Sequence, residues 1–212
     1  MTTTCFIPPT FQSRVVPVIV LTDAAHAVPL AHALLDGGID VMEITLRSSA
    51  ALASIEAVAK AVPQMHVGAG TVTRVAEVQQ VIDAGATFAL SPGCTDALLD
   101  AVQAARLPFI PGVMTPGEVM LRREQGFSLM KLFPAQQAGG LGMLKALGGP
   151  LPDVRFCPTG GVSVDNLGEF LKLPNVAMAG GSWLTPVDAM VAGDWARITA
   201  LAAAAVAVAR SV

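Results

Sequence analysis

Lys131 lies within the run Ser128-Leu-Met-Lys-Leu-Phe-Pro134, whose apolar residues predict a buried strand. Taking an ammonium group out of water is costly, so a lysine in such a place usually has a function. An amine that has lost its proton in an apolar environment attacks carbonyl carbons and forms Schiff bases. The alternative is a lysine at a strand end whose amine reaches solvent.

Glu43, Thr45 and Arg47 form a second polar set inside an apolar run. Residues two apart on a strand share one face, so the three side chains are expected to point the same way. Burial favours the protonated form of Glu43 and nearby cations favour its carboxylate, which leaves a group able to exchange a proton. The alternative is a purely structural ion pair with Lys131 or Arg47. Arg47 either pairs with Glu43 or holds a substrate carboxylate with its planar fork.

Two glycine pairs follow the last predicted strands, in Pro158-Thr159-Gly160-Gly161 and in Gly180-Gly181-Ser182. Glycine lets backbone N–H groups approach an anion, and the N-terminus of a following helix attracts negative charge. A single such turn is usually just a connection, but two turns at neighbouring positions predict a phosphate site. Phe133 is expected either in the core or as a wall that keeps water from the carbonyl site.

The elements that must position these residues alternate between short β-branched runs and helical patterns. No linker divides the 212 residues, so we expect a single domain over residues 1–212. Its α/β fold is predicted to be a (β/α)8 TIM barrel, with an open doubly wound sheet as the alternative. The strands are expected at Val15–Leu21, Val41–Leu46, His66–Gly70, Phe88–Ser91, Phe109–Pro111, Ser128–Phe133, Val154–Cys157 and Val176–Ala179, each followed by a helix.

Composition excludes several classes of function. The chain is 53% hydrophobic and only 14% charged, which favours a deeply buried domain whose remaining apolar surface is covered in a homo-oligomer. A net charge of −3 with scattered Lys and Arg argues against nucleic-acid and membrane partners. The sequence has no CxxC pair and no histidine–carboxylate cluster, so neither a metal nor a cofactor is expected. Residues 1–9 do not look like a secretory signal, which predicts a cytoplasmic location.

Several runs together resemble the 2-keto-3-deoxy-6-phosphogluconate (KDPG) and 2-keto-4-hydroxyglutarate (KHG) aldolase family. They extend from about Val15 to the C-terminal helix and are Val-Pro-Val-Ile-Val, Glu43-Ile-Thr-Leu-Arg47, Val-Gly-Ala-Gly-Thr71, Ser-Pro-Gly93, Lys131-Leu-Phe-Pro-Ala, Arg-Phe-Cys-Pro-Thr-Gly-Gly-Val162 and Gly-Gly-Ser182-Trp. The occurrence of all these runs together, in the order found in the family, is far more specific than any single run. The resemblance implies a homotrimeric, metal-free class I aldolase of the Entner–Doudoroff pathway, which makes pyruvate and glyceraldehyde 3-phosphate.

The resemblance also implies roles for individual residues. Lys131 would be the Schiff-base lysine and Glu43 the proton-transferring carboxylate, while Arg47 and Thr71 would bind the substrate carboxylate. The other implied contacts are Phe133, Pro92 and Thr159 in the pocket, and Gly160, Gly161, Gly181 and Ser182 at the phosphate. Members of the family also cleave KHG, and related enzymes act on the galactonate epimer, so the resemblance leaves the substrate range open.

Two other functions fit parts of the sequence. A phosphosugar isomerase or epimerase on the same barrel would use the phosphate turns and ignore Lys131. Such an enzyme would need a second acid–base group across the pocket, and the sequence does not indicate one. A non-catalytic phosphate-binding barrel would also fit the composition and the fold. Both alternatives predict that no covalent adduct forms with the substrate.

Overall fold

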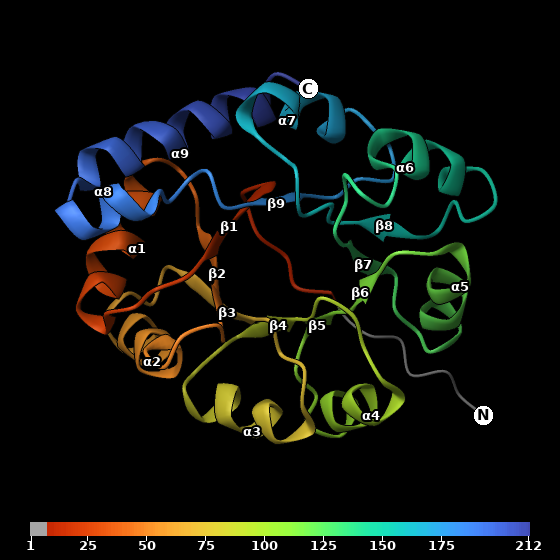
Figure 1. Ribbon diagram of the computed structural model, residues 1–212, viewed down its shortest axis with the longest axis horizontal. Helices are drawn as coiled ribbons and strands as arrows, with labels where there is room; N and C mark the ends of the chain where they lie inside the picture. The colour runs from red at the N-terminus through yellow and green to blue at the C-terminus, as the bar shows by residue number, and fades with distance from the viewer. Residues whose placement is uncertain (1–7) are drawn as a thin grey trace.

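The computed structural model describes residues 8–212, in which short strands alternate with helices (Figure 1). The prediction of a cytoplasmic location was based on residues 1–9, of which residues 1–7 lie outside the described part of the chain. The strands are β1 (Val15–Ile19), β2 (Val41–Thr45), β3 (His66–Gly70), β4 (Phe88–Leu90), β5 (Phe109–Ile110), β6 (Gly112–Val113), β7 (Leu129–Leu132), β8 (Arg155–Phe156) and β9 (Ala179–Gly181).

A helix follows each strand that the sequence predicted, as expected for repeated βα units. The helices are α1 (Ala27–Asp36), preceded by the short 3-10 helix η1 (Ala24–His26), α2 (Ala51–Ala61), α3 (Val75–Asp83), α4 (Asp96–Ala104), α5 (Pro116–Glu124), α6 (Gly140–Gly148), α7 (Val164–Leu171), α8 (Val187–Ala192) and α9 (Trp195–Arg210). Helix α5 begins with a capping box. Thr115 Oγ1 accepts a hydrogen bond from the Glu118 amide, and the Glu118 carboxylate accepts one from the Thr115 amide.

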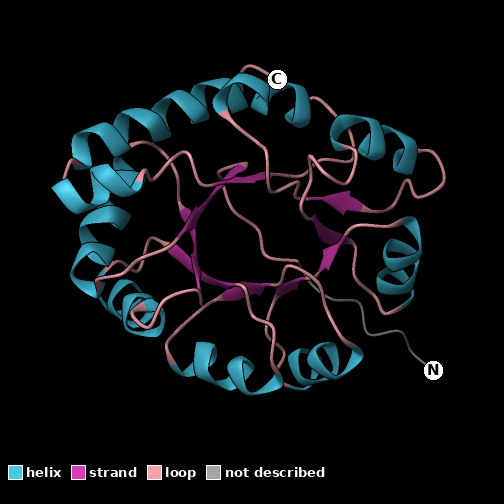
Figure 2. Ribbon diagram, in the orientation of Figure 1, coloured by secondary structure: helices cyan, strands magenta, loops and turns pink. Residues whose placement is uncertain are grey.

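The strand pairs are parallel and form two sheets, with the orders β5-β4-β3-β2-β1-β9 and β6-β7-β8. Figure 2 shows the strands curled around the middle of the molecule with the helices outside them. The strands are almost continuously buried, because helices cover one side of the sheet and the curled strands cover the other. The α/β class and the parallel sheet predicted from the sequence are confirmed.

Two strand predictions were wrong in detail. The strand expected at Phe109–Pro111 is split at Pro111, which has no N–H for a ladder hydrogen bond, and pairing resumes at Gly112–Val113. The last strand was predicted to end at Ala179, but β9 begins there and includes Gly180 and Gly181. Glycine is a poor strand former, so the sequence placed Gly180 and Gly181 in a turn; in the structure they pair with β1, and the Thr159 side chain fills the space beside Gly180.

None of the helices in the described residues is both long and apolar enough to cross a membrane. Within residues 8–212, histidine, cysteine and carboxylate side chains do not gather in a group able to hold a metal ion.

Candidate active site

Lys131 and Glu43 form a buried ion pair. The Lys131 Nζ atom lies 2.9 Å from Glu43 Oε1 and 3.3 Å from Oε2, and the two residues are only 4% and 1% exposed. The lysine therefore does not extend its amine into solvent, which was the structural alternative considered for it. The Nζ atom also lies 5.5 Å from the centre of the Phe133 ring, as expected for residues two apart on one strand face.

The strands β2 and β7 do not pair with each other, so these side chains, 88 positions apart in the sequence, meet across the inside of the curled strands (Figure 2). Glu43 on β2 pairs with Gly68 on β3, and Lys131 on β7 pairs with Gly112 on β6. Gly70 makes room for the carboxylate, because a Cβ atom added there would lie 2.1 Å from Glu43 Oε1. The Glu43 side chain thus rests against glycine backbone while its oxygens reach the amine.

Arg47 follows β2 and does not pair with Glu43, contrary to one of the two roles considered for it. Its Nε atom donates to Thr45 Oγ1 at 3.1 Å, and Thr45 Oγ1 donates in turn to the backbone oxygen of Ile19 at 2.8 Å. Thr45 is buried, whereas Arg47 is exposed. The hydroxyl therefore holds the base of the guanidinium, and in the described residues the two terminal amino groups have no acceptor.

Thr71 lies at the end of β3, the strand next to β2. Its φ angle is 60°, a left-handed conformation that is rare for a β-branched residue. Such strain costs about 1–3 kcal/mol and is commonest at functional sites. The neighbouring strands β2 and β3 thus deliver Arg47 and Thr71 to the same edge of the sheet, since Thr45 pairs with Gly70.

Pro92 follows β4 and lies beside the strand that pairs with Lys131. A Cβ atom added to Gly112 would lie 2.3 Å from the Pro92 carbonyl carbon, so the two backbones are in close contact. Ser91 fixes this approach, because its Oγ accepts a hydrogen bond from the Gly112 amide at 3.3 Å. The predicted pocket residue Pro92 therefore lies against β6, the strand that pairs with the lysine strand β7.

Cys157 and Thr159 follow β8, the strand that pairs with the lysine strand β7, and Cys157 interacts electrostatically with both members of the ion pair. The Cys157 sulfur lies 3.8 Å from Thr159 Oγ1, and both side chains are buried. Burial raises the pKa of the Cys157 thiol to about 11. The positive charge of Lys131 works against this rise and the negative charge of Glu43 adds to it. The thiol is therefore protonated and neutral at physiological pH, so it is no nucleophile.

The two glycine pairs lie side by side, as the sequence predicted, but only Gly160–Gly161 forms a turn, because Gly180 and Gly181 belong to β9. Thr159 and Gly180 form a parallel bridge, and a Cβ atom at Gly180 would lie 2.4 Å from Thr159 Oγ1. Gly160 and Gly161 have positive φ angles of 95° and 82°. Ser182 is exposed directly after Gly181, which is buried at the end of β9 rather than in a turn.

The family model described as KDPG and KHG aldolase matches residues 10–201. The chain belongs to this family. A 2-dehydro-3-deoxy-phosphogluconate aldolase from Pseudoalteromonas atlantica is 54% identical over 196 residues, or 92% of this chain and 91% of that protein. A KHG/KDPG aldolase from Escherichia coli K12 is 50% identical over 192 residues, or 91% of this chain and 90% of that protein.

Solved structures of aldolases agree with this assignment. A KDPG aldolase from Legionella pneumophila, with pyruvate captured at low pH as a covalent carbinolamine intermediate, matches with a TM-score of 0.89 at 46% identity. The match covers 92% of this chain and 94% of that one. A KDPG aldolase from Zymomonas mobilis ZM4 with 3-phosphoglycerate matches with a TM-score of 0.86 at 41% identity, over 92% of this chain and 91% of that one.

Two residues of this aldolase support the site. The sequence places Thr45 on the same face as Glu43 and Arg47 but does not indicate its role, and it does not single out Gly70. Gly70 accommodates the Glu43 carboxylate, and Thr45 holds Arg47. Thr45 had a signal, because it stands between Glu43 and Arg47 on one strand face. Gly70 had none, because no sequence pattern tells which side chain fills the space beside a strand glycine.

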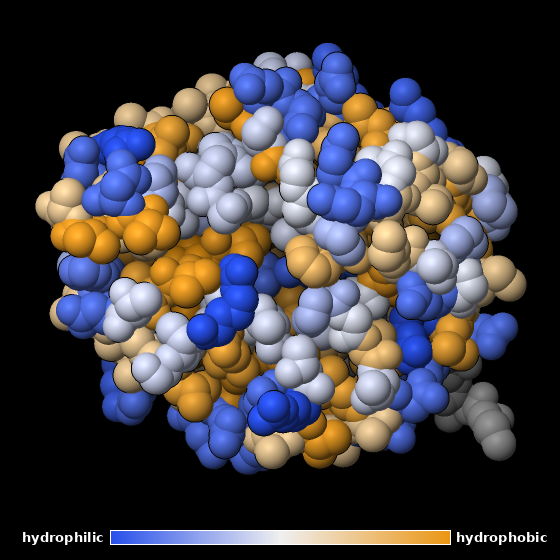
Figure 3. Space-filling view, viewed as in Figure 1, coloured by the Kyte–Doolittle hydropathy of each residue, from blue (hydrophilic) through white to orange (hydrophobic). Residues whose placement is uncertain are grey.

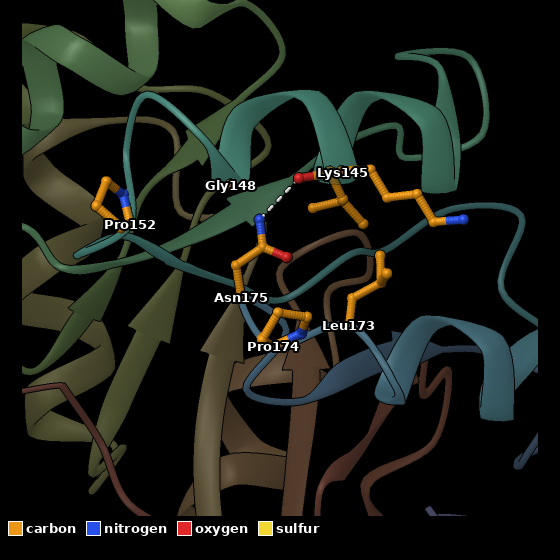
Figure 4. Close-up of a pocket in the computed structure, with 7 residues that line it drawn as sticks. Lys145, Gly148, Pro152, Leu173, Pro174 and Asn175 are labelled. Atoms are coloured by element: carbon orange, nitrogen blue, oxygen red, sulfur yellow. Dashed lines mark hydrogen bonds between the residues drawn. The ribbon is translucent and has the colours of Figure 1, made fainter.

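A separate pocket of about 350 Å³ lies at the opposite end of the strands (Figure 4). Its lining includes Asn175, whose Nδ2 atom donates to the backbone oxygen of Leu144 at 2.8 Å. Lys145 belongs to the rim, and Figure 4 shows its side chain extending away from Asn175. This pocket therefore lacks the converging charged groups found around Lys131.

Proposed function

We propose that this protein is a class I Schiff-base aldolase that cleaves KDPG to pyruvate and glyceraldehyde 3-phosphate. The observation that carries the proposal is the buried hydrogen bond between Lys131 Nζ and Glu43 Oε1. Family membership supports the same reaction, since relatives are named KDPG aldolase and KHG/KDPG aldolase. We extend the proposal to KHG, which would yield pyruvate and glyoxylate.

The first step requires a neutral amine at Lys131. Transfer of a proton along the 2.9 Å hydrogen bond from Nζ to Glu43 Oε1 would leave a neutral amine and a neutral acid. The amine attacks the keto carbon of the substrate to give a carbinolamine. The Glu43 acid then returns its proton to the carbinolamine hydroxyl, which leaves as water, so that an iminium ion forms and the Glu43 carboxylate is restored. This cation is the electron sink for the bond that breaks next, so the chemistry needs no redox partner.

Glu43 then acts as the proton carrier. Its carboxylate takes the proton of the substrate hydroxyl at C4, through water, as the bond between C3 and C4 breaks. The products of this step are glyceraldehyde 3-phosphate and an enamine on Lys131. Protonation of the enamine and hydrolysis of the resulting imine release pyruvate and restore the amine. Phe133 beside the amine limits the access of water during these steps.

The ends of the substrate are assigned to different parts of the site. The terminal amino groups of Arg47, together with Thr71, would bind the carboxylate, because the Thr45 hydroxyl holds the guanidinium by Nε alone. Pro92 and Thr159 would line the pocket. The phosphate would be bound by the Gly160–Gly161 turn and by the adjacent end of β9, which contributes Gly181 and is followed by Ser182.

We infer further that the two sheets are parts of one closed (β/α)8 barrel and that the described residues 8–212 form a single domain; residues 1–7 of the predicted domain lie outside the described residues. The inference treats residues 109–113 as one strand interrupted at Pro111. The Lys131 amide donates to the Pro111 oxygen at 2.8 Å, which supports continuous pairing across the interruption. The bridges of Phe156 to Val176 and of Thr159 to Gly180 support closure between β8 and β9.

The proposed assembly is a homo-oligomer in the cytoplasm, and its trimeric state comes from the family resemblance. Large apolar side chains are exposed on short helices, among them Met120 and Leu121 on α5 and Val187 and Val191 on α8. Figure 3 shows hydrophobic patches between hydrophilic side chains on one face of the molecule. Covering such surface favours self-association. Sedimentation equilibrium would measure the assembly, and a monomer at micromolar concentration would contradict it.

A direct test of the function is an assay of KDPG cleavage in which pyruvate is measured with lactate dehydrogenase and NADH. Wild-type protein should release one pyruvate per KDPG and should remain active after treatment with EDTA. The glyceraldehyde 3-phosphate formed is measured separately with its dehydrogenase. Absence of both products from folded protein would overturn the proposed reaction.

A phosphosugar isomerase remains the second candidate, but the site disfavours it. Such an enzyme needs two acid–base groups on opposite sides of the substrate. The thiol of Cys157 interacts electrostatically with both Lys131 and Glu43, but its pKa of about 11 is too high for a base at neutral pH. Isomerase activity would also leave Lys131 without a covalent role, so it predicts no adduct with pyruvate.

A further inference from the structure

The turn after β8 presents backbone N–H groups on one side because its carbonyl groups are held on the other. The oxygens of Thr159 and Gly160 accept hydrogen bonds from the amides of Ala135 at 2.8 Å and Gln136 at 3.0 Å. In a trans peptide the C=O and the N–H point in opposite directions. The N–H groups of Gly160 and Gly161 therefore point away from the segment after β7.

The next carbonyl in the turn is held by a side chain. Asn166 Nδ2 donates to the Gly161 oxygen at 2.9 Å, while Asn166 Oδ1 accepts from the Ser163 amide at 2.9 Å. By the same argument, this bond turns the Val162 N–H away from the asparagine. Among residues 8–212, the N–H groups of Gly160, Gly161 and Val162 have no protein acceptor. Three consecutive donors are thus left for an anion.

We propose that Asn166 is a positioning residue that sets the affinity of this turn for the substrate phosphate. It lies on helix α7, outside the glycine motif, and the inference rests on the proposed phosphate role of Gly160 and Gly161. Peptide planes beside glycine rotate at little cost because glycine tolerates both signs of φ. Without Asn166, the peptide between Gly161 and Val162 loses the bond that orients it, and its N–H no longer has a fixed direction.

The test compares Asn166→Ala with Glu169→Ala, an exposed residue on the same helix. Steady-state kinetics with KDPG and competitive inhibition by inorganic phosphate report on the turn. Borohydride trapping with pyruvate, which has no phosphate, reports on the Lys131 centre. We expect Asn166→Ala to raise the KM for KDPG and the inhibition constant for phosphate about threefold to tenfold, as for loss of one hydrogen bond.

The other measurements identify a positioning effect. The kcat of Asn166→Ala and the pyruvate concentration for half-maximal trapping should stay within about twofold of wild type, and Glu169→Ala should match wild type throughout. Asn166→Gln keeps an amide donor and should recover part of the lost affinity. Thermal unfolding of each variant shows whether helix α7 is still in place.

Two results would overturn the role of Asn166. One is an unchanged phosphate inhibition constant in Asn166→Ala, and the other is a loss of pyruvate trapping equal to the loss of KDPG affinity. Failure of the proposed function looks different, because wild-type protein would then release no pyruvate from KDPG. Inhibition and trapping are measured on separate ligands, so the two failures can be told apart.

Discussion

The reaction centre and the proposed phosphate site are built in different ways. At the centre, the side chains of Lys131 on β7 and Glu43 on β2 meet 2.9 Å apart across the inside of the curled strands. At the phosphate site, the groups available are backbone amides of the Gly160–Gly161 turn. The first region depends on which side chains are present and the second on how peptide planes are held. Substitutions at the reaction centre should therefore impair the chemistry at the keto acid end of the substrate, and substitutions at the phosphate site should impair binding of its phosphate end.

Removal of the nucleophile should have the largest effect. Lys131→Ala eliminates Schiff-base formation, and we expect KDPG turnover to fall by roughly a thousandfold or more. The substitution also leaves Glu43 buried without its partner, which lowers the free energy of unfolding by about 3–5 kcal/mol in comparable pairs. The double variant Lys131→Met with Glu43→Gln has no unpaired charge and serves as the folding control. Substantial turnover by folded Lys131→Ala would refute the mechanism.

Glu43→Gln separates a proton carrier from a structural ion-pair partner. Glutamine keeps the shape and can still accept a hydrogen bond from Lys131, so the fold should survive. If Glu43 moves protons, kcat for KDPG should fall roughly a hundredfold to ten-thousandfold. Rapid-quench measurement of imine and product formation locates the slowed step. A wild-type kcat in this variant would leave Glu43 with a structural role only.

Gly70→Ala tests whether the carboxylate must lie against bare backbone. The added methyl group would come within 2.1 Å of Glu43 Oε1, so the carboxylate must move. A displacement of about 1 Å at a catalytic group lowers the rate roughly a hundredfold. Gly117→Ala is the matched control, because nothing lies within 4 Å of a Cβ atom at that position. Equal kcat values for the two variants would show that the close approach is unimportant.

Gly161→Ala tests the second region. Alanine is strained at a φ of 82°, and its Cβ atom would lie 2.5 Å from Gln136 Cβ, so the turn must shift. We expect the KM for KDPG to rise about tenfold, while borohydride trapping with pyruvate stays close to wild type. Parallel losses in both assays would mean that the two regions do not act separately.

Thr45→Val should have the smallest effect. Valine keeps the volume and removes the hydroxyl that holds Arg47 Nε at 3.1 Å. The pyruvate concentration needed for half-maximal trapping should rise about threefold to tenfold, with little change in the maximal rate. Thr45→Ser retains the hydroxyl and should behave like wild type. An identical response of the two variants would show that Thr45 does not position the arginine.

The sequence was most informative about the reaction centre. A lysine and a glutamate in apolar strands are unusual enough to be recognised singly, and their period-two neighbours Thr45 and Phe133 follow from strand geometry. The parallel α/β class likewise follows from the alternating patterns. The split at Pro111 was missed because the prediction ended the strand at the proline instead of continuing beyond it.

The supporting residues were not predictable because they depend on contacts between distant segments. Gly70 and Gly180 look like ordinary strand-end glycines, and only the structure shows that Glu43 and Thr159 fill the space beside them. Asn166 reads as a residue in the first turn of a helix, with no sign that it reaches Gly161. Side chains that react are thus easier to find from sequence than residues that hold others in place.

The most direct test of the Schiff-base account is borohydride reduction in the presence of pyruvate, followed by intact mass measurement and peptide mapping. Wild-type protein and Lys131→Ala are treated in parallel, with folding of both confirmed by circular dichroism. The account predicts one reduced pyruvate adduct per chain, located at Lys131 and absent from the variant. Folded wild-type protein without an adduct, or an adduct mapped to another lysine, would contradict it.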